Sequence, residues 1–116
     1  MTVRTLEKTE WHGYFDRMTT ALLGKRAEIE VASLELGDQI EAEWVALLGV
    51  TYDPKNDVLE IALDGLDHLV PKPRQVYVDE GLVGLDNFEV IDHAGVRHIV
   101  RLREPLMLPA PSTAVR

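Results

Sequence analysis

Four glutamates in two pairs are the side chains of this sequence best placed to do chemistry together. Glu28 and Glu30 lie in one alternating run, and Glu41 and Glu43 lie in the next. If the two runs fold back on each other as a β-hairpin, the four carboxylates share one face. Such a group could bind a divalent cation through its oxygens, or supply an acid and a base. We favour a third interpretation, half of a surface ion-pair ladder, because arginines are available in the last predicted strand.

The four histidines show no pair at metal-ligand spacing. We place His12 on a helix surface, His93 in a turn, and His98 on the inward face of the last strand as a hydrogen-bonded core residue. His68 lies in a segment of ambiguous structure.

Other chemistry has little support in the sequence. Neither serine, Ser33 or Ser112, stands in a glycine-rich nucleophile elbow. The acids Asp79, Glu80 and Asp86 lack the ligand spacing of a calcium loop, and we interpret them as solvated. The chain contains no cysteine, which excludes disulfides, thiolate nucleophiles and Cys-ligated metals. We therefore predict no catalytic residue, no cofactor and no metal, with the four glutamates as the remaining metal candidates.

Composition narrows the class of protein. The 116 residues suffice for one domain with its own core, and 46% of them are hydrophobic. A net charge of −8 disfavours nucleic acid as a partner, since binding rests on neutralised phosphates. No apolar run approaches the roughly 18–20 residues of a membrane span, and we expect no signal peptide. We expect a cytoplasmic protein.

A hairpin at residues 25–47 organises the predicted fold. Its first strand alternates apolar and charged residues, and its second strand does the same after a turn at 36–38. The alternation predicts one buried and one exposed face. The residues expected on the buried face are Ala27, Ile29 and Val31 in the first strand and Ile40, Ala42, Trp44 and Ala46 in the second.

One amphipathic helix is predicted before the hairpin, at residues 10–23. Trp11, Phe15, Met18 and Leu22 fall on one side of it, and we expect this stripe to pack on the sheet with both Trp11 and Trp44 buried. Thr9 is the predicted N-cap, and Gly24 the left-handed residue after the helix. Residues 1–8 are expected to be loosely held.

Shorter strands follow the hairpin. They are predicted at 58–63, 75–79, 88–92 and 96–104, whereas 66–70 fits either a helical turn or an edge strand. Residues 1–105 then form a single helix-plus-barrel domain, and 106–116 an extended or mobile tail.

The final strand has a predicted neighbour. Arg97, Arg101 and Arg103 share one face of it, while Val96, Val100 and Leu102 share the other with His98. Four crowded glutamates need cations nearby. The last strand should therefore pair with residues 25–31, which would close or nearly close a barrel.

One helix followed by about five or six bent strands predicts a mainly β (α+β) fold, with the helix packed on a small, strongly bent antiparallel barrel. The string LLGKRAEIEV resembles the opening of Sm-like and SH3-like barrels. That resemblance implies RNA binding, but the sequence has no Arg-Gly pair where Sm proteins contact RNA.

A broader resemblance covers nearly the whole chain. EWHGYFDRMTTALLGKRAEIEV, LLGVTYDPKNDVLEIALDGLDHLV, RQVYVDEG and HIVRLREPLMLPAP resemble the DUF5335 family of uncharacterised bacterial proteins. The resemblance implies a bacterial protein and assigns no activity or catalytic residue.

Three functional hypotheses follow. The first is a non-enzymatic β-barrel module that works by binding or assembly, as a homo-oligomer or with another protein, because exposed strand edges invite pairing. The second is a small acid/base or divalent-metal-dependent enzyme using Glu28, Glu30, Glu41 and Glu43. The third is Sm-like RNA binding.

Overall fold

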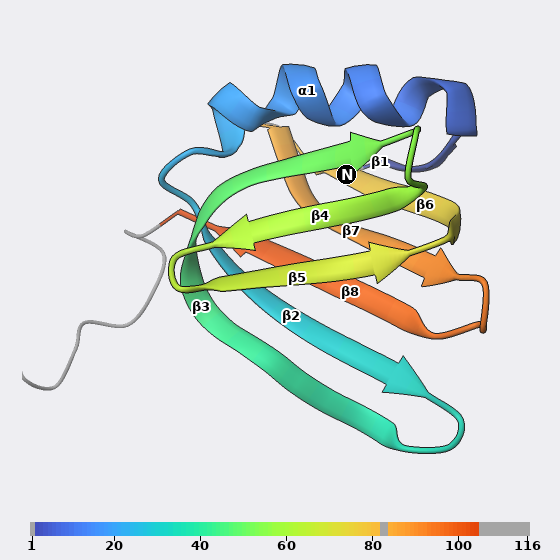
Figure 1. The fold of residues 1–116 in the computed structure, drawn as a ribbon. Helices are drawn as coiled ribbons and strands as arrows, with labels where there is room; N and C mark the ends of the chain where they lie inside the picture. The colour runs from blue at the N-terminus through green and yellow to red at the C-terminus, as the bar shows by residue number, and fades with distance from the viewer. Residues whose placement is uncertain (1, 82–83, 105–116) are drawn as a thin grey trace, which may run out of the picture.

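Eight antiparallel strands form one strongly curled sheet with a helix across one end (Figure 1). The computed structural model describes residues 2–81 and 84–104. The expected tail at 106–116 lies outside them. In chain order the elements are β1 (Thr2–Leu6), a 3-10 turn (Lys8–Glu10), α1 (Trp11–Leu22), β2 (Arg26–Ser33), β3 (Gly37–Asp53), β4 (Val58–Leu63), β5 (Leu66–Pro71), β6 (Pro73–Gly81), β7 (Gly84–Asp92) and β8 (Arg97–Arg103).

The strand order is β1-β6-β7-β8-β2-β3-β4-β5, so β1 and β5 are the two edges. The curl brings β4 and β5 in front of β7 and β8, with the core between these layers (Figure 1). The prediction of a mainly β fold with one N-terminal helix on a bent antiparallel sheet is confirmed. Two details differ: there are eight strands, not five or six, and the sheet does not close into a barrel.

The predicted partner of the last strand is confirmed. β8 pairs with β2 along its whole length, with Ile29 opposite Val100 inside and Glu28 opposite Arg101 outside. Ala27 and Ile29 of β2 and Val100 and Leu102 of β8 are buried at this seam. One register therefore satisfies the core and the charged face at once.

The helix forms nearly where predicted, and its apolar stripe meets the sheet. The ring centres of Phe15 and Phe88 are 5.2 Å apart. Trp11 packs edge-on against Tyr52, with 5.1 Å between the ring centres. Gly24 has a φ of 87° and ends the helix as predicted. The prediction of Thr9 as N-cap is wrong, because the 3-10 turn already includes it.

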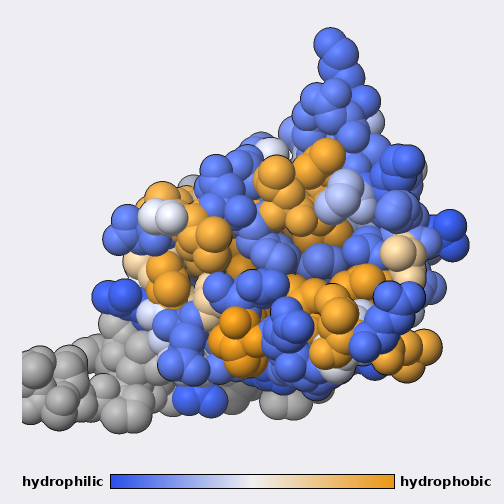
Figure 2. All heavy atoms as spheres, turned by 60° about the horizontal axis from the view of Figure 1, so that its bottom comes forward, coloured by the Kyte–Doolittle hydropathy of each residue, from blue (hydrophilic) through white to orange (hydrophobic). Residues whose placement is uncertain are grey.

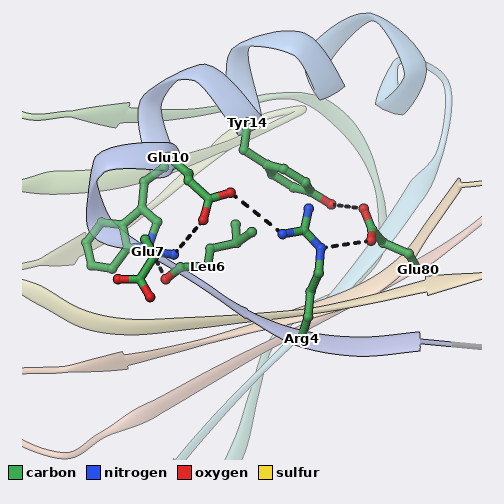
Figure 3. A network of polar contacts seen from close by, with 7 residues as sticks. Arg4, Leu6, Glu7, Glu10, Tyr14 and Glu80 are labelled. Atoms are coloured by element: carbon green, nitrogen blue, oxygen red, sulfur yellow. Dashed lines mark hydrogen bonds and ion pairs between the residues drawn. The ribbon is translucent and has the colours of Figure 1, made fainter.

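Residues 2–6 are not the loose lead-in that was expected. They form the edge strand β1, which pairs with β6 from Thr2 to Leu6, and Leu6 enters the core. Arg4 reaches Glu10 and Glu80, and Tyr14 donates its hydroxyl to Glu80 at 2.8 Å (Figure 3). Burial and this hydrogen bond raise the pKa of Tyr14. Polar contacts among Arg4, Glu10, Tyr14 and Glu80 thus help to hold β1, which has few apolar residues to bury.

The buried position predicted for Trp44 is wrong. Between the pairs Ala27–Val45 and Ile29–Ala42, β3 has one residue more than β2, and a second shift follows beside Glu30. Trp44 adopts a φ of 52° in this bulge and turns outward, where the guanidinium of Arg103 lies 4.6 Å from its ring centre. An extra residue reverses the inside and outside of a strand, which is why Ile40 is exposed too.

The segment at residues 66–70, which fitted either a helical turn or an edge strand, is the edge strand β5. β5 pairs with β4, and it places Val70 in the core and His68 on the same inward face. Within residues 2–81 and 84–104, no helix is long and apolar enough to cross a membrane.

Candidate functional site

The four predicted glutamates do not form one cluster. Glu28 and Glu30 both accept from Nη1 of Arg101, at 3.0 and 2.9 Å, whereas Glu41 and Glu43 project from the bulged part of β3 and are exposed. Hydrogen bonding to Asp38 and to Arg101 lowers the pKa of Glu30. Glu30 therefore shares its surroundings with Asp38, which the sequence did not single out.

The predicted ion-pair ladder is confirmed for one arginine of three. Arg101 lies against Glu28 and Glu30, as expected. Arg97 instead binds Glu89 of β7 through two parallel bonds of 2.7 and 3.0 Å, and Arg103 stacks on Trp44. In the part of the chain that the structure describes, no three His, Asp or Glu side chains are arranged to hold a metal ion.

A different group of titratable side chains meets inside the open end of the sheet. Nε2 of His98 lies 3.0 Å from Oδ2 of Asp92, and Nδ1 of His98 lies 2.9 Å from Nε2 of His68. Asp92 ends β7, His98 lies in β8, and His68 lies in β5, which does not pair with either. Asp92 and His98 are buried, and His68 is half-buried. We call these three residues the histidine relay.

The turn after β7 fixes the carboxylate of the relay. Oδ1 of Asp92 accepts from the amides of Ala94 and Val96 at 2.9 and 3.1 Å. Burial acts to raise the pKa of Asp92, but the bonds from His98 and from these amides outweigh it, and the pKa lies below its usual range. Asp92 is therefore ionised at neutral pH.

An ionised carboxylate only accepts hydrogen bonds, so Nε2 of His98 carries the hydrogen that binds Oδ2 of Asp92. Nδ1 of His98 and Nε2 of His68 share one further hydrogen, because one of these two nitrogens must accept from the other.

The contact between the two imidazoles is a hydrogen bond in line with both rings. The ring centres are 5.1 Å apart, and this exceeds the 2.9 Å nitrogen separation by about two ring radii. Both nitrogens thus lie close to the line joining the ring centres. Two rings chelating one ion would instead point their lone pairs to a place off that line, so the geometry is that of proton sharing.

The surroundings of His68 favour its neutral form. Burial lowers the pKa of His68, the neighbouring His98 lowers it further, and the carboxylate of Glu41 acts in the opposite direction. The relay is thus neutral at its outer end and negative at its inner end.

Sequence reasoning recovered parts of this site and missed the contact itself. His98 is the buried, hydrogen-bonded histidine that was predicted, and His12 and His93 are exposed as expected. The approach of His68 to His98 had no signal in the sequence, because it depends on how far the sheet curls.

A hollow of about 370 Å³ lies between the tip of the β2–β3 hairpin and the turn from β7 to β8. None of the three residues of the relay lines it. Val96 lines it two residues before His98, and Ser33 lines it two residues after Val31, the partner of His98. We call it the hairpin hollow; its full lining is Ser33, Leu34, Glu35, Leu36, Ala94, Gly95 and Val96.

The hairpin tip is also unusually apolar for a surface. Leu34 is fully exposed, Leu36 is 72% exposed, and Ile40 is 50% exposed. In Figure 1 the hairpin extends beyond the rest of the sheet. Figure 2 shows the lower side of the molecule, where apolar side chains form separate groups among polar ones.

Comparison with known proteins decides the family. The model of the family of unknown function DUF5335 matches residues 2–111. The chain belongs to this family. One relative, an uncharacterised protein of the bacterium Aquifex aeolicus (strain VF5), is 38% identical over 110 residues, which cover 94% of this chain and 99% of the relative. No solved structure matches the chain. The resemblance to DUF5335 inferred from the sequence is thus confirmed.

Proposed function

We propose that this protein is a non-enzymatic binding and assembly module, and that it joins a second copy of itself through the tip of the β2–β3 hairpin. The observation that carries the proposal is the fully exposed Leu34 beside the hairpin hollow. A projection and a hollow on one surface suit a two-fold interface, in which each copy inserts Leu34 into the hollow of the other. A cytoplasmic location is part of the proposal, supported by the absence of cysteine.

The exposed apolar side chains support an interface at this place. Leu34 and Leu36 come from the hairpin, whereas Ala94 and Val96 supply apolar surface from the turn opposite. Burying such a patch against a partner removes apolar area from water, at about 25 cal/mol per Å². Contiguous apolar surface on a soluble protein commonly marks a contact site.

The rival hypotheses have weaker support. Arg101 pairs with both Glu28 and Glu30 and offsets one of their two charges, which weakens the case for an acid/base or metal-dependent enzyme built on the four glutamates. Sm-like RNA binding must overcome a net charge of −8.

Light scattering coupled to size-exclusion chromatography tests the assembly. We expect the mass to rise with protein concentration, and Leu34→Ser to remain a monomer where the wild type associates. Leu48→Ser is the control, because Leu48 is an exposed leucine on β3, away from the hairpin tip. A clean monomer at the highest concentration, or an equal loss in both variants, would refute assembly through the hairpin tip.

Salt distinguishes assembly from the RNA hypothesis. Two copies of charge −8 repel each other, so screening should strengthen the self-association as salt rises. Binding to a single-stranded RNA oligonucleotide would weaken with salt, because it releases counterions. Tight RNA binding that falls steeply with salt would favour the rival.

A further inference from the structure

A hydrogen bond between two side chains ties β5 to the opposite layer of the sheet. β5 is an edge strand, with β4 as its neighbour in the strand order. Nε2 of His68 in β5 lies 2.9 Å from Nδ1 of His98 in β8, although these two strands are not paired in the sheet. The bond therefore fastens an edge strand to the layer behind it (Figure 1).

The bond between the two rings limits how many protons the histidine relay can hold. One of the two facing nitrogens must accept the shared hydrogen, so at least one ring must be neutral. A first added proton satisfies this condition, because a protonated ring can donate to its neutral neighbour. A second added proton does not. A protonated imidazole carries a hydrogen on each nitrogen and only donates, so two donors would then face each other across the contact.

The neighbouring strands place apolar residues beside both rings. His98 lies opposite Val31 of β2 and Val90 of β7, and His68 lies opposite Ile61 of β4. His98 is buried and His68 is half-buried, so water screens their charges only in part. The positive charge of an added proton must therefore be balanced by the carboxylates near the relay.

Two carboxylates act on the relay, one from β7 and one from β3. Asp92 accepts from Nε2 of His98 at 3.0 Å and can balance one positive ring. Burial and the neighbouring His98 lower the pKa of His68, and Glu41 opposes them without reversing the shift. A second positive ring would lie 5.1 Å from the first, between ring centres, where like charges repel. The second proton therefore binds only below the ordinary pH range of histidine.

We propose that the histidine relay is an acid-sensitive latch, which fastens β5 to β8 while one of its rings is neutral and releases β5 when both are protonated. Val70 of β5 is fully buried in the core. Release therefore loosens the edge strand locally and leaves the fold intact. The latch acts within one chain, so it does not depend on the self-association proposed above.

Different side chains at position 68 should respond differently to acid. The amide of His68→Gln can accept from a protonated His98 or donate to a neutral one, so β5 should stay fastened at every pH. The side chain of His68→Leu forms no hydrogen bond, so β5 should be loose at every pH. His93→Gln is the control: it removes an exposed histidine in the turn after Asp92 and should respond to acid as the wild type does.

Hydrogen exchange of the β5 amides, followed by NMR in dilute protein, measures the release. It is compared at pH values of about 7.5 and 4.5, on either side of the usual histidine pKa. Each rate is divided by the intrinsic rate at the same pH, and the amides of β6 serve as the internal reference. In the wild type and in His93→Gln, acid should lower the protection of β5 relative to β6 by about fivefold, the equilibrium factor of a typical hydrogen bond. In His68→Gln this ratio should not change.

Nitrogen-15 NMR of the histidine rings in the wild type tests the proton count and needs no variant to fold. The two rings should take up their protons in two steps, and β5 should lose protection with the second step. Loss of protection on the first proton would overturn the proposal. Equal protection of β5 at both pH values, or the same acid response in His68→Gln as in the wild type, would overturn it as well.

Discussion

Replacing Trp11 by alanine should remove a large part of the stability of this fold. The indole is 1% exposed, packs edge-on against Tyr52, and donates from Nε1 to the carbonyl of Leu6 at 3.2 Å. Truncation of a buried tryptophan to alanine costs about 3–5 kcal/mol. We expect the upper part of that range, because the carbonyl of Leu6 also loses its side-chain partner and the anchor of β1 is weakened.

Trp44→Ala is the matched control, with the same chemical change at an outward-facing site. Trp44 is half-buried and is covered by the guanidinium of Arg103, a contact of about 0.5–1 kcal/mol at an exposed position. Urea unfolding followed by far-ultraviolet circular dichroism gives both losses in free energy of unfolding. A loss below about 1 kcal/mol for Trp11→Ala, or equal losses for the two variants, would refute this assignment of inside and outside.

Three further changes test other contacts. Arg101→Gln should destabilise far less than Trp11→Ala, and 1 M salt should reduce the difference from the wild type, because the Arg101 side chain is 42% exposed. Tyr14→Phe should cost about 1–2 kcal/mol in unfolding experiments, since Glu80 loses a hydrogen bond to its charge but keeps Arg4; no loss would mean that β1 is not held by this network. The folded-state pKa of His68 is lowered, so its contribution is intact above the unfolded pKa of about 6.5 and declines as the pH falls through the folded pKa. His68→Gln should flatten this part of the stability curve, and an unchanged slope would contradict the burial of that ring.

The alternation of apolar and polar residues correctly predicted the strands in which it runs without interruption. The strand at Val58–Leu63 forms at the predicted residues, and the pairing of β2 with β8 follows from apolar and charged rows that agree. The helix also forms within one residue of its predicted ends. In these segments local pattern and tertiary packing favour the same structure.

Features that depend on an interruption of the pattern were not predictable. The bulge in β3 inserts residues that the sequence does not mark with glycine, so Trp44 was assigned to the wrong face. Of residues 3–6 in β1, only Leu6 is buried in the core, and Arg4 forms ion pairs with Glu10 and with the distant Glu80. The relay requires β5 to approach β8 through the curl of the sheet, and no spacing in the chain encodes that distance.

The long strand β3 belongs to two parts of the sheet, because its two halves pair with different strands. Its first part, up to Ala46, pairs with β2, and its last part, from Leu47, pairs with β4. β3 is therefore the strand through which β4 and β5 are hydrogen-bonded to the other strands. Any outward swing of β4 and β5 must turn about the irregular step between Leu47 and Gly49. The bond between His68 and His98 is a side-chain contact that ties β5 directly to β8, two strands that are not paired in the sheet.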